Sequence, residues 1–257
     1  MIAEFSLKKG AIAMLRQLKN LLSRSKRVVF FGGAGVSTES GIPDFRSESG
    51  SFKALEQYGA PPEELLSRHF FLQNPGVFFR YYKENLLHPD ALPNKAHLAL
   101  ARLERQGKLT AVITQNVDGL HQLAGSENVL ELHGSAQRNY CMDCGARYPL
   151  SYIIDPACCP DGLVPRCSCE GVVRPDIVLY DELLDSDVMA RSAEAIRQAD
   201  TMVVGGTSLV VYPAAGLLRY FRGSLVLINR TPTQYDDRAQ LVFRQSIGEV
   251  LSAAVEP

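Results

Sequence analysis

Short apolar runs, each closed by a polar or glycine-rich turn, recur along this chain. They lie at 28–31, 109–113, 129–132, 200–204 and 224–228. Four or five such residues between turn signals are typical of buried strands. The stretches between the runs carry helical patterns, and strands that alternate with helices indicate a parallel sheet covered on both faces. The pattern therefore predicts an α/β fold with a Rossmann-like, doubly wound parallel sheet.

Two of the intervening stretches predict helices. Leu15, Leu18 and Leu22 recur on one helical face ahead of the first apolar run. The stretch Leu92–Gln106 has a proline at its second residue and Gly107 after its end, which is the usual punctuation of a helix.

Residues 51–87 predict a small helical layer. Helix starts are expected at Pro61-Pro62, which precedes two glutamates, and at Asn74-Pro75. Aromatic stripes usually mark burial, so most rings of this stretch are expected in a core. These rings belong to Phe70, Phe71, Phe78, Phe79, Tyr81 and Tyr82.

Composition narrows the class of protein. The chain has 257 residues, of which 46% are hydrophobic, enough for one large domain with a smaller insert. Its formal net charge of −1 argues against nucleic-acid binding as the main function, and no apolar run is long enough to span a bilayer. The basic segment up to Arg27 fits a first helix better than a targeting peptide. We see no secretory signal and expect a cytoplasmic protein with reduced thiols.

The six cysteines cluster in one part of the chain, which favours a metal over disulfides. Cys141 and Cys144 form a C-x-x-C pair, whose turn places two thiolates suitably for one tetrahedral Zn²⁺. A second pair must come from downstream. The remaining candidates are Cys158, Cys159, Cys167 and Cys169. Four protein ligands leave no open coordination position, so the predicted zinc is structural.

The stretch Phe30–Ser47, FFGGAGVSTESGIPDFRS, carries the most specific signal. It runs from an apolar strand into glycines and then into hydroxyl residues. Glycines let the backbone approach a pyrophosphate, and N–H groups at a following helix start attract anionic oxygen. The G-A-G spacing is shorter than G-x-G-x-x-G, so by itself this turn indicates nucleotide binding only weakly.

The longer string Gly33–Ser47 resembles the signature of the sirtuin family, the NAD-dependent protein-lysine deacylases. Three further stretches agree with that family: TQNVDGLH at Thr114–His121, LHG at Leu132–Gly134 and GTSLVVYPAA at Gly206–Ala215. The resemblance covers nearly the whole chain after about residue 20. The compact length suits a bacterial or archaeal member.

The resemblance implies a single catalytic domain, 1–257, divided into two parts. The large Rossmann-like part would comprise 1–47, 90–137 and 173–257. The small part would be built from a helical insert, 48–89, and a zinc insert, 138–172.

The segment VPRCSCEGVVRPDIV resembles the part of the family that carries the second zinc pair. The family pair is C-x-x-C, whereas this one is C-x-C, one residue shorter. A set that uses Cys158 or Cys159 is the alternative. The implied ligands are Cys141, Cys144, Cys167 and Cys169.

The resemblance also implies the residues of the active site. His133 and Asn116 are the implied catalytic residues, His133 as the general base. Phe45, Val117 and Asp118 would line the nicotinamide pocket. The full set implied to bind NAD is Gly33, Ala34, Gly35, Thr38, Asp44, Phe45, Arg46, Gln115, Asn116, Val117, Asp118, His133, Gly206, Thr207, Ser208, Asn229 and Ile247.

In the implied reaction the acyl oxygen of an acyl-lysine attacks C1′ of the nicotinamide ribose, and nicotinamide leaves. His133 then deprotonates a ribose hydroxyl, a role that suits an imidazole because it titrates near neutrality. Collapse gives free lysine and an O-acyl-ADP-ribose. The reaction needs no metal and no serine nucleophile.

The implied partners are proteins or peptides with acylated lysines, with no specific nucleic acid and no membrane. A peptide would bind by strand addition between Asp181–Leu184 and Val210–Tyr212. The implied substrate contacts are Val178, Tyr180, Asp181, Glu182 and Val211.

Two departures from family patterns bear on substrate choice. The family usually reads F-G-E where this chain has Tyr180-Asp181-Glu182, and the extra acid suggests a preference for basic residues near the lysine. Members that remove succinyl or malonyl groups carry an arginine three residues from a tyrosine, and no arginine lies near Tyr58. We therefore expect an apolar acyl pocket, suited to acetyl groups, with longer fatty acyl groups as a further option.

Other classes of function remain as alternatives. A mono-ADP-ribosyltransferase or an NAD glycohydrolase would use the same cofactor residues with another acceptor. A non-catalytic NAD sensor has no need of the base His133. An NAD oxidoreductase would normally carry an acid after the second strand to bind ribose, and is the least favoured.

Overall fold

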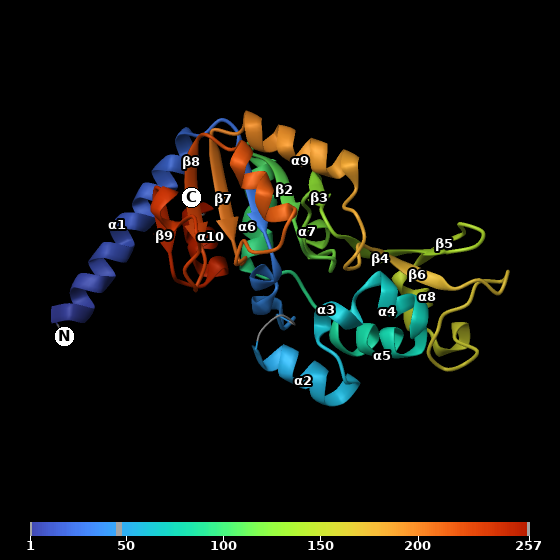
Figure 1. The fold of residues 1–257 in the computed structure, drawn as a ribbon. Coiled ribbons are helices and arrows are strands. Elements are labelled where there is room, and N and C mark those ends of the chain that lie inside the picture. Colours follow the sequence, from blue (N-terminus) through green and yellow to red (C-terminus); the bar gives the residue numbers. More distant parts are fainter. Residues whose placement is uncertain (1, 45–47, 256–257) are drawn as a thin grey trace.

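A six-stranded parallel sheet forms the centre of the larger of two lobes (Figure 1). The computed structural model describes residues 2–44 and 48–255, and the side chains of 10–44 and 51–255. The strand order is β3-β2-β1-β7-β8-β9, and every neighbouring pair is parallel. The strands are β1 (Val28–Gly32), β2 (Leu109–Thr114), β3 (Val129–Glu131), β7 (Thr201–Gly205), β8 (Ser224–Ile228) and β9 (Leu241–Phe243). The five predicted strands are confirmed to within one residue, and β9 is an addition.

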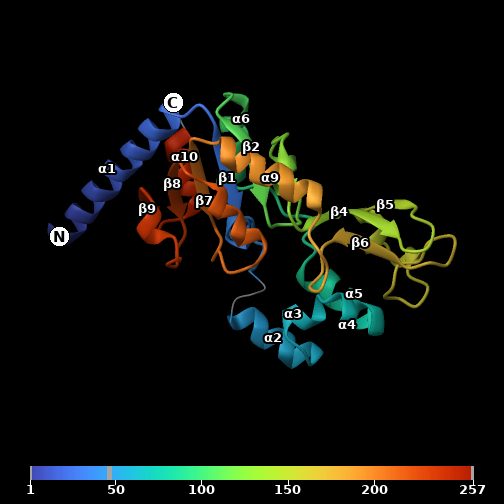
Figure 2. The same ribbon diagram turned by 45° about the horizontal axis from the view of Figure 1, so that its top comes forward.

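Helices cover both faces of this sheet (Figure 2). One face packs against α1 (Ile2–Arg24), α6 (Lys95–Arg105) and α10 (Ile247–Val255). The other packs against α9 (Ser186–Gln198) and the 3-10 helix η4 (Ala214–Tyr220). Adjacent side chains of a strand point to opposite faces, so Phe30 enters the first core and Phe31 the second. The doubly wound fold is confirmed.

The two predicted helices of the larger lobe are also confirmed. Leu18 and Leu22 of α1 are buried, and Leu15 packs against the same core. Helix α6 begins after Asn94, whose side chain accepts a hydrogen bond from the Ala96 N–H (2.8 Å). Among the described residues, no helix has the length and apolar character needed to cross a bilayer.

The smaller lobe joins a helical layer to a three-stranded antiparallel sheet of order β5-β4-β6. Both inserts contribute to one core, which contains Phe71, Phe78 and Phe79 from the helical insert and Ile153 and Val164 from the zinc insert. Val173 and Ile177 of β6 join the same core. The burial expected for the aromatic stretch is thus confirmed, although Phe70 is only partly buried. The elements are α2 (Glu48–Tyr58), α3 (Pro62–Leu65), α4 (Arg68–Gln73), α5 (Pro75–Asn85), β4 (Gly134–Cys141), β5 (Arg147–Pro149), α8 (Leu150–Ile154), η3 (Pro156–Cys158) and β6 (Val173–Ile177).

The chain after β1 differs from the expected glycine turn and α-helix start. Two 3-10 turns follow instead, η1 (Ala34–Val36) and η2 (Thr38–Ser40), each of three residues. Ser and Thr compete with helical hydrogen bonds, and Gly41 at φ 83° ends the second turn, which explains why no α-helix forms. A cofactor bound at this loop would therefore contact two short 3-10 turns rather than the start of an α-helix. The remaining short elements are α7 (Leu120–Leu123) and η5 (Asp236–Arg238).

Candidate functional site

The carboxyl ends of β1, β2 and β7 meet at one edge of the sheet. β1 lies between the other two strands, because the chain winds outward through β2 and β3 and then returns to β7 on the other side. In open α/β sheets ligands bind at such a reversal of strand order. The loops after these strands carry the signature stretch, TQNVDG and GTSL.

Glycines allow the loops after β1 and β7 to touch. The Gly35 N–H donates to the Gly206 carbonyl oxygen at 2.9 Å. A Cβ on Gly35 would lie 2.7 Å from the Gly206 Cα, and a Cβ on Gly206 would lie 2.4 Å from the Val36 nitrogen. Gly206 also has φ +60°, a conformation that favours glycine. Only glycine fits at these two positions without displacing backbone.

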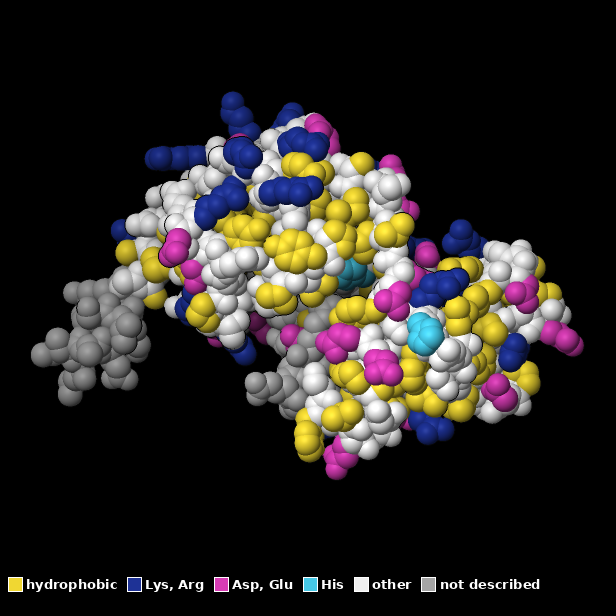
Figure 3. All heavy atoms as spheres, in the orientation of Figure 1, with side chains coloured by type: hydrophobic (Ala, Val, Ile, Leu, Met, Phe, Trp, Pro, Cys, Tyr) yellow, Lys and Arg dark blue, Asp and Glu magenta, His cyan; other side chains and the backbone are white. Residues whose placement is uncertain are grey.

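A cavity of about 220 Å³ lies between the two lobes, next to this edge of the sheet. Figure 3 shows the hollow between the lobes on the outer surface. Eleven residues predicted to bind NAD or substrate line the cavity: Ala34, Gln115, Asn116, Val117, Asp118, His133, Val178, Tyr180, Asp181, Glu182 and Val211. The structure therefore brings together side chains from both lobes that lie far apart in the sequence.

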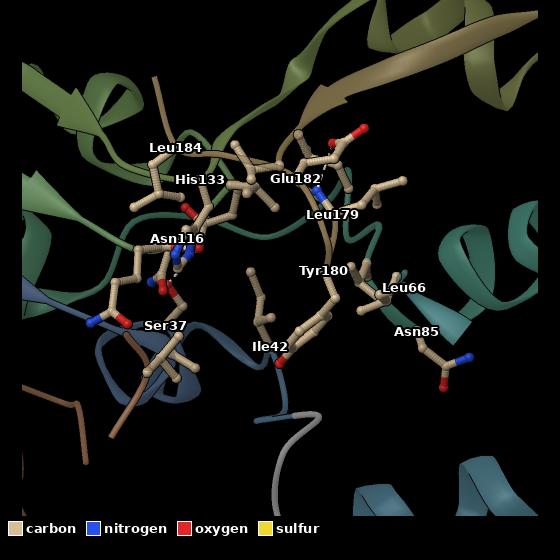
Figure 4. A pocket seen from close by; sticks show the side chains of 18 of the residues that line it. Ser37, Ile42, Leu66, Asn85, Asn116, His133, Leu179, Tyr180, Glu182 and Leu184 are labelled. Carbon is tan, nitrogen blue, oxygen red and sulfur yellow. Dashed lines mark hydrogen bonds between the residues drawn. The ribbon is translucent and has the colours of Figure 1, made fainter. Parts of the chain in front are cut away.

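Polar side chains form a connected chain at one end of the cavity (Figure 4). The Asn116 side-chain amide donates to the Ser37 hydroxyl at 3.0 Å, and that hydroxyl donates to an Asp118 carboxylate oxygen at 2.7 Å. The other Asp118 oxygen accepts from the Leu120 N–H at 2.9 Å. Because each group is held by a partner, the orientations of Asn116 and Asp118 are fixed before any ligand binds.

His133 is held in one tautomer. Its Nδ1 lies 2.9 Å from the Gln115 carbonyl oxygen, and a carbonyl can only accept, so Nδ1 carries the proton. In the neutral imidazole, the lone pair is then on Nε2. The backbone behind the ring is fixed as well, since the His133 carbonyl accepts from the Val178 N–H at 2.9 Å. Gly134 follows at φ +76°, where a Cβ would lie 2.1 Å from the Asp176 carbonyl oxygen.

The opposite end of the cavity is mostly apolar, with Asn85 as a polar member of its lining. Ile42, Leu66 and Tyr180 face the polar cluster across the cavity in Figure 4. Leu86 and Leu179 add further apolar lining. No arginine or lysine is among the described residues that line this cavity. Such a lining agrees with the expected apolar acyl pocket.

A buried ion pair fastens the Val178–Glu182 loop to the small lobe. Arg174 is 6% exposed and donates to both Glu182 oxygens, at 2.6 and 3.0 Å. Burial alone would raise the pKa of Glu182, but the hydrogen bonds from Arg174 and from the Leu179 N–H, with the charges of Arg174 and Arg68, hold it below its ordinary value. Glu182 is thus ionised near neutrality and serves as an anchor of the loop.

Several predicted NAD residues do not line the cavity. Gln115 connects to them, because its side-chain amide donates to the Thr207 hydroxyl at 3.1 Å. The Asn229 amide donates to the Thr231 carbonyl, and Ile247 is 5% exposed against Gly205. The residues beside or beyond the cavity are Gly33, Gly35, Thr38, Asp44, Gly206, Thr207, Ser208, Asn229 and Ile247. Phe45 and Arg46 lie outside the described residues, and contact of all these residues with NAD stays a prediction.

Sequence reasoning missed some residues of the cavity. Ser37 is the centre of the polar chain, yet it was not among the predicted site residues. Its place inside the signature GAGVST was the available signal. Leu66 and Leu86 come from the helical insert, where apolar residues are common and nothing local distinguishes those that face a cavity.

Four cysteines of the small lobe form a metal-sized cluster. The sulfur atoms of Cys141, Cys144, Cys167 and Cys169 all lie within 4.8 Å of one another. The Cys141–Cys169 pair is at 3.5 Å and the Cys144–Cys167 pair at 3.6 Å. Four thiolates about 2.3 Å from a tetrahedral zinc would be spaced about 3.8 Å apart, so this cluster fits a structural zinc site. Neither Cys158 nor Cys159 belongs to the cluster.

The short C-x-C pair reaches the cluster through a tight turn. Glu170 has φ 68°, and the Cys167 N–H donates to the Gly171 carbonyl oxygen at 2.8 Å. A Cβ on Gly171 would lie 2.7 Å from the Cys141 sulfur. The left-handed residue and the glycine thus compensate for the missing spacer of the usual C-x-x-C pair.

Two relatives in sequence carry the same name. A chain from Clostridium acetobutylicum named NAD-dependent protein deacetylase is 54% identical, over 94% of this chain and 98% of its own. A chain of the same name from Clostridium perfringens is 53% identical, with the same two coverages.

Solved structures agree with this fold. A Sir2 homolog–NAD complex is 37% identical with a TM-score of 0.83, covering 93% of this chain and 92% of that one. A Sir2 bound to a deacetylated peptide and 3′-O-acetyl-ADP-ribose is 37% identical with a TM-score of 0.84, covering 94% and 99%. The Sir2 family model matches residues 33–213, which include the signature loop, the polar chain, His133 and the four cysteines. With its sequence, its fold and its site in agreement, the chain belongs to the Sir2 family.

Proposed function

We propose that this chain is an NAD-dependent protein-lysine deacetylase, which releases nicotinamide and O-acetyl-ADP-ribose. One observation carries the proposal: His133, whose Nδ1 is held by the Gln115 carbonyl, lines one cavity together with the polar Asn116 and Asp118 and with apolar side chains at the other end. The relatives named NAD-dependent protein deacetylase support it at 53–54% identity.

The donors and acceptors of the polar end suit NAD. Asp118 offers a carboxylate to a carboxamide N–H₂, and Asn116 offers an amide to ribose hydroxyls. When bound, NAD supplies the ribose carbon that accepts the acyl oxygen, with nicotinamide as the leaving group. The touching glycine loops and the Gln115–Thr207 hydrogen bond hold the region proposed for the phosphates and adenosine.

Two features of the chain would promote the chemistry. The Gln115 carbonyl holds His133 as the Nδ1–H tautomer, so that Nε2 can accept a proton from a ribose hydroxyl and return it later. The apolar side chains Ile42, Leu66 and Leu179 would exclude water from the acyl group. We place the acyl-lysine stem beside Val178.

The peptide would bind as an added strand between two exposed segments, Asp181–Leu184 and Val210–Tyr212. Members of both segments line the cavity. Leu183 is 95% exposed, Val210 67% and Tyr212 64%, which leaves an apolar rim for a partner. Backbone pairing would supply affinity, and the cavity would receive the acylated side chain.

We further propose a cytoplasmic location. All six cysteines are free of disulfides, and four of them form the zinc-sized cluster. Thiolate zinc sites need reduced cysteines, which the cytoplasm maintains.

The test is mass spectrometry of an acetyl-lysine peptide incubated with NAD and with the wild-type protein, His133→Ala or His69→Ala. We expect deacetylated peptide and O-acetyl-ADP-ribose in equal amounts, with activity lost in His133→Ala. The exposed His69 is the matched control, and its variant should keep wild-type activity. Release of nicotinamide from NAD while the peptide stays acetylated would overturn the proposal in favour of ADP-ribosyl transfer or NAD hydrolysis.

A further inference from the structure

Asp181 occupies a backbone position that favours glycine. Its φ is 72°, in the left-handed region. The sirtuin pattern usually has glycine here, in F-G-E, and this chain has Tyr180-Asp181-Glu182. The chain keeps the backbone conformation of glycine and adds a charged side chain, of a type that tolerates this conformation better than most side chains, at some cost in strain. A residue other than glycine in this conformation beside a functional site points to a role for its side chain.

Two cavities share Asp181 as a lining residue. One is the proposed active-site cavity. The other has a volume of about 520 Å³ and is also bounded by Leu132 and Arg138 from the β3–β4 region and by Val188 of α9. Segment 181–184, where the peptide strand is proposed to pair, therefore separates the acyl pocket from a second cavity. Successive side chains of a bound strand point in opposite directions, so substrate side chains next to the acyl-lysine would pass close to Asp181.

The second cavity carries more acids than bases, and most of its acids are already paired. Arg138 binds Glu131 at 2.7 Å and Asp176 at 3.1 Å. Arg174 binds Glu182 at 2.6 Å. Arg138 and Arg174 line the same cavity, so these bonds pair three of its five carboxylates. The five belong to Glu131, Asp176, Asp181, Glu182 and Asp185.

Asp185 is occupied in a different way. Its carboxylate accepts hydrogen bonds from the Asp187 and Val188 N–H groups, at 2.8 and 2.9 Å, and so caps α9. Within the described parts of the chain, Asp181 is the carboxylate of this cavity that forms neither an ion pair nor a side-chain hydrogen bond. It is also exposed, and it lies at the rim where a peptide would pass.

From this geometry we propose that Asp181 selects substrates with a lysine or arginine side chain within two residues of the acyl-lysine. The inference rests on the proposed deacetylase function. An exposed ion pair contributes little, and a like charge costs a similar amount, so an arginine peptide should exceed its glutamate counterpart about threefold to tenfold in kcat/KM. The Debye length is about 10 Å at 0.1 M salt and about 3 Å at 1 M, so added salt should remove most of the difference.

The test uses acetyl-lysine peptides that differ at one flanking position, with arginine, glutamine or glutamate placed in turn at −2, −1, +1 and +2. For each protein the arginine-to-glutamate ratio of kcat/KM is measured at low and high salt. The ratio is the readout because it does not depend on the absolute activity of a variant.

Asp181→Asn removes the charge and keeps a side chain that tolerates the left-handed backbone. Asp181→Gly restores the usual family residue and relieves the strain. The matched control is Asp187→Asn, which removes one negative charge from the exposed start of α9. We expect a ratio near one at every position for both Asp181 variants and the wild-type ratio for Asp187→Asn.

Three results are possible, and each decides a different point. A ratio well above one for at least one position in the wild type, lost in both Asp181 variants, supports the inference. Deacetylation of all peptides with equal kcat/KM, or selectivity that persists without Asp181, overturns it and leaves the deacetylase proposal standing. Failure to deacetylate any peptide overturns the proposed function itself.

Discussion

Two buried imidazoles lie behind the polar end of the cavity. His97 and His121 are 0% and 1% exposed, and their ring centroids are 4.7 Å apart. Burial lowers the pKa of His121 to about 3, and the proximity of His97 acts in the same direction. Burial also lowers the pKa of His97, against the opposing charges of Asp118 and Glu39. Both rings are therefore neutral at pH 7.

The burial of His121 makes the stability of the folded protein sensitive to acid. The folded-state pKa of His121 lies below its ordinary value of 6.5, so between pH 3 and 6.5 the unfolded chain binds more protons. Its contribution to stability is present above pH 6.5 and is lost as the pH falls through that window. From pH 7 to 5 we expect the free energy of unfolding to fall by about 2 kcal/mol from His121 alone.

Urea denaturation at pH 7 and pH 5 would measure this loss. In His121→Asn the pH-dependent loss should shrink by that amount, because an amide does not titrate in this range. His69→Asn, at an exposed position, should keep the wild-type dependence. Equal pH dependence in wild type and His121→Asn would show that other groups cause the acid sensitivity.

The position of a residue inside a motif was easier to predict than the hydrogen bonds that connect two motifs. His133 and Asn116 stand in strings that identify their neighbourhood, and both line the cavity. Ser37 binds Asn116 and Asp118, which are 79 and 81 positions away in the chain. Such a bond depends on the packing of β1 beside β2, and no local pattern reports it.

At the scale of elements, the contact between Gly35 and Gly206 holds the loops after β1 and β7 together at the edge of the sheet where the site lies. Gly206→Ala would place a Cβ 2.4 Å from a backbone nitrogen at a left-handed φ. We expect it to destabilise the protein by about 2–3 kcal/mol and to abolish NAD binding, because overpacking and backbone strain add. Gly10→Ala is the control, since none of the described parts of the chain lies within 4 Å of a Cβ at that position and alanine favours helix α1.

Thermal unfolding and NAD titration would check both variants. Gly10→Ala should raise stability by about 0.5–1 kcal/mol and leave NAD affinity unchanged. Wild-type NAD affinity in Gly206→Ala would contradict the role given to the loop contact.

The zinc-sized cluster is the second element on which the small lobe depends. The core of the small lobe joins β4 and β6 to α4 and α5. β4 carries Cys141, and β6 begins shortly after Cys169. Chelation should therefore unfold the β4–β6 region and also increase hydrogen exchange in α5, because metal binding and folding are coupled.

Substitution of each cysteine by serine, followed by zinc analysis, would identify the ligands. We expect about one zinc per chain in the wild type and in Cys158→Ser and Cys159→Ser, and loss of zinc in Cys141→Ser or Cys169→Ser. Loss of activity on chelation with unchanged hydrogen exchange would argue against a structural role for the metal.

Strands of the large sheet were predictable because they are buried on both faces. β1, β7 and β8 read as continuous apolar runs, which polar-faced strands do not. The small sheet was not predicted, since β4 (GSAQRNYC) and β6 (VRPDI) mix polar residues, a proline and an irregular register. Their pairing follows from the zinc cluster and the shared core rather than from their own sequences.

At the scale of the whole molecule, the cavity joins two lobes that have separate cores. Among the residues whose side chains the structure describes, the core of the small lobe shares no buried residue with the two cores that flank the large sheet. The cavity is lined by Asn116 and His133 next to the large sheet and by Leu66, Leu86 and Tyr180 next to the small lobe (Figure 4). This arrangement could not be predicted from local patterns, because it depends on how the inserts fold back over the sheet edge.

A ligand that contacts both lobes should favour the binding of a second ligand in the same cavity. NAD and an acetyl-lysine peptide are both proposed to bind there, and the first to bind would order side chains that the second also needs. We expect NAD to tighten peptide binding about fivefold or more, and the peptide to tighten NAD binding by the same factor, since coupling is reciprocal. Calorimetric titration of the wild type with an NAD analogue whose glycosidic bond cannot be cleaved would measure the two factors without turnover. The unacetylated peptide is the control, because it can pair with segment 181–184 without filling the apolar end of the cavity. Equal peptide affinity with and without NAD would show that the two lobes bind their ligands independently.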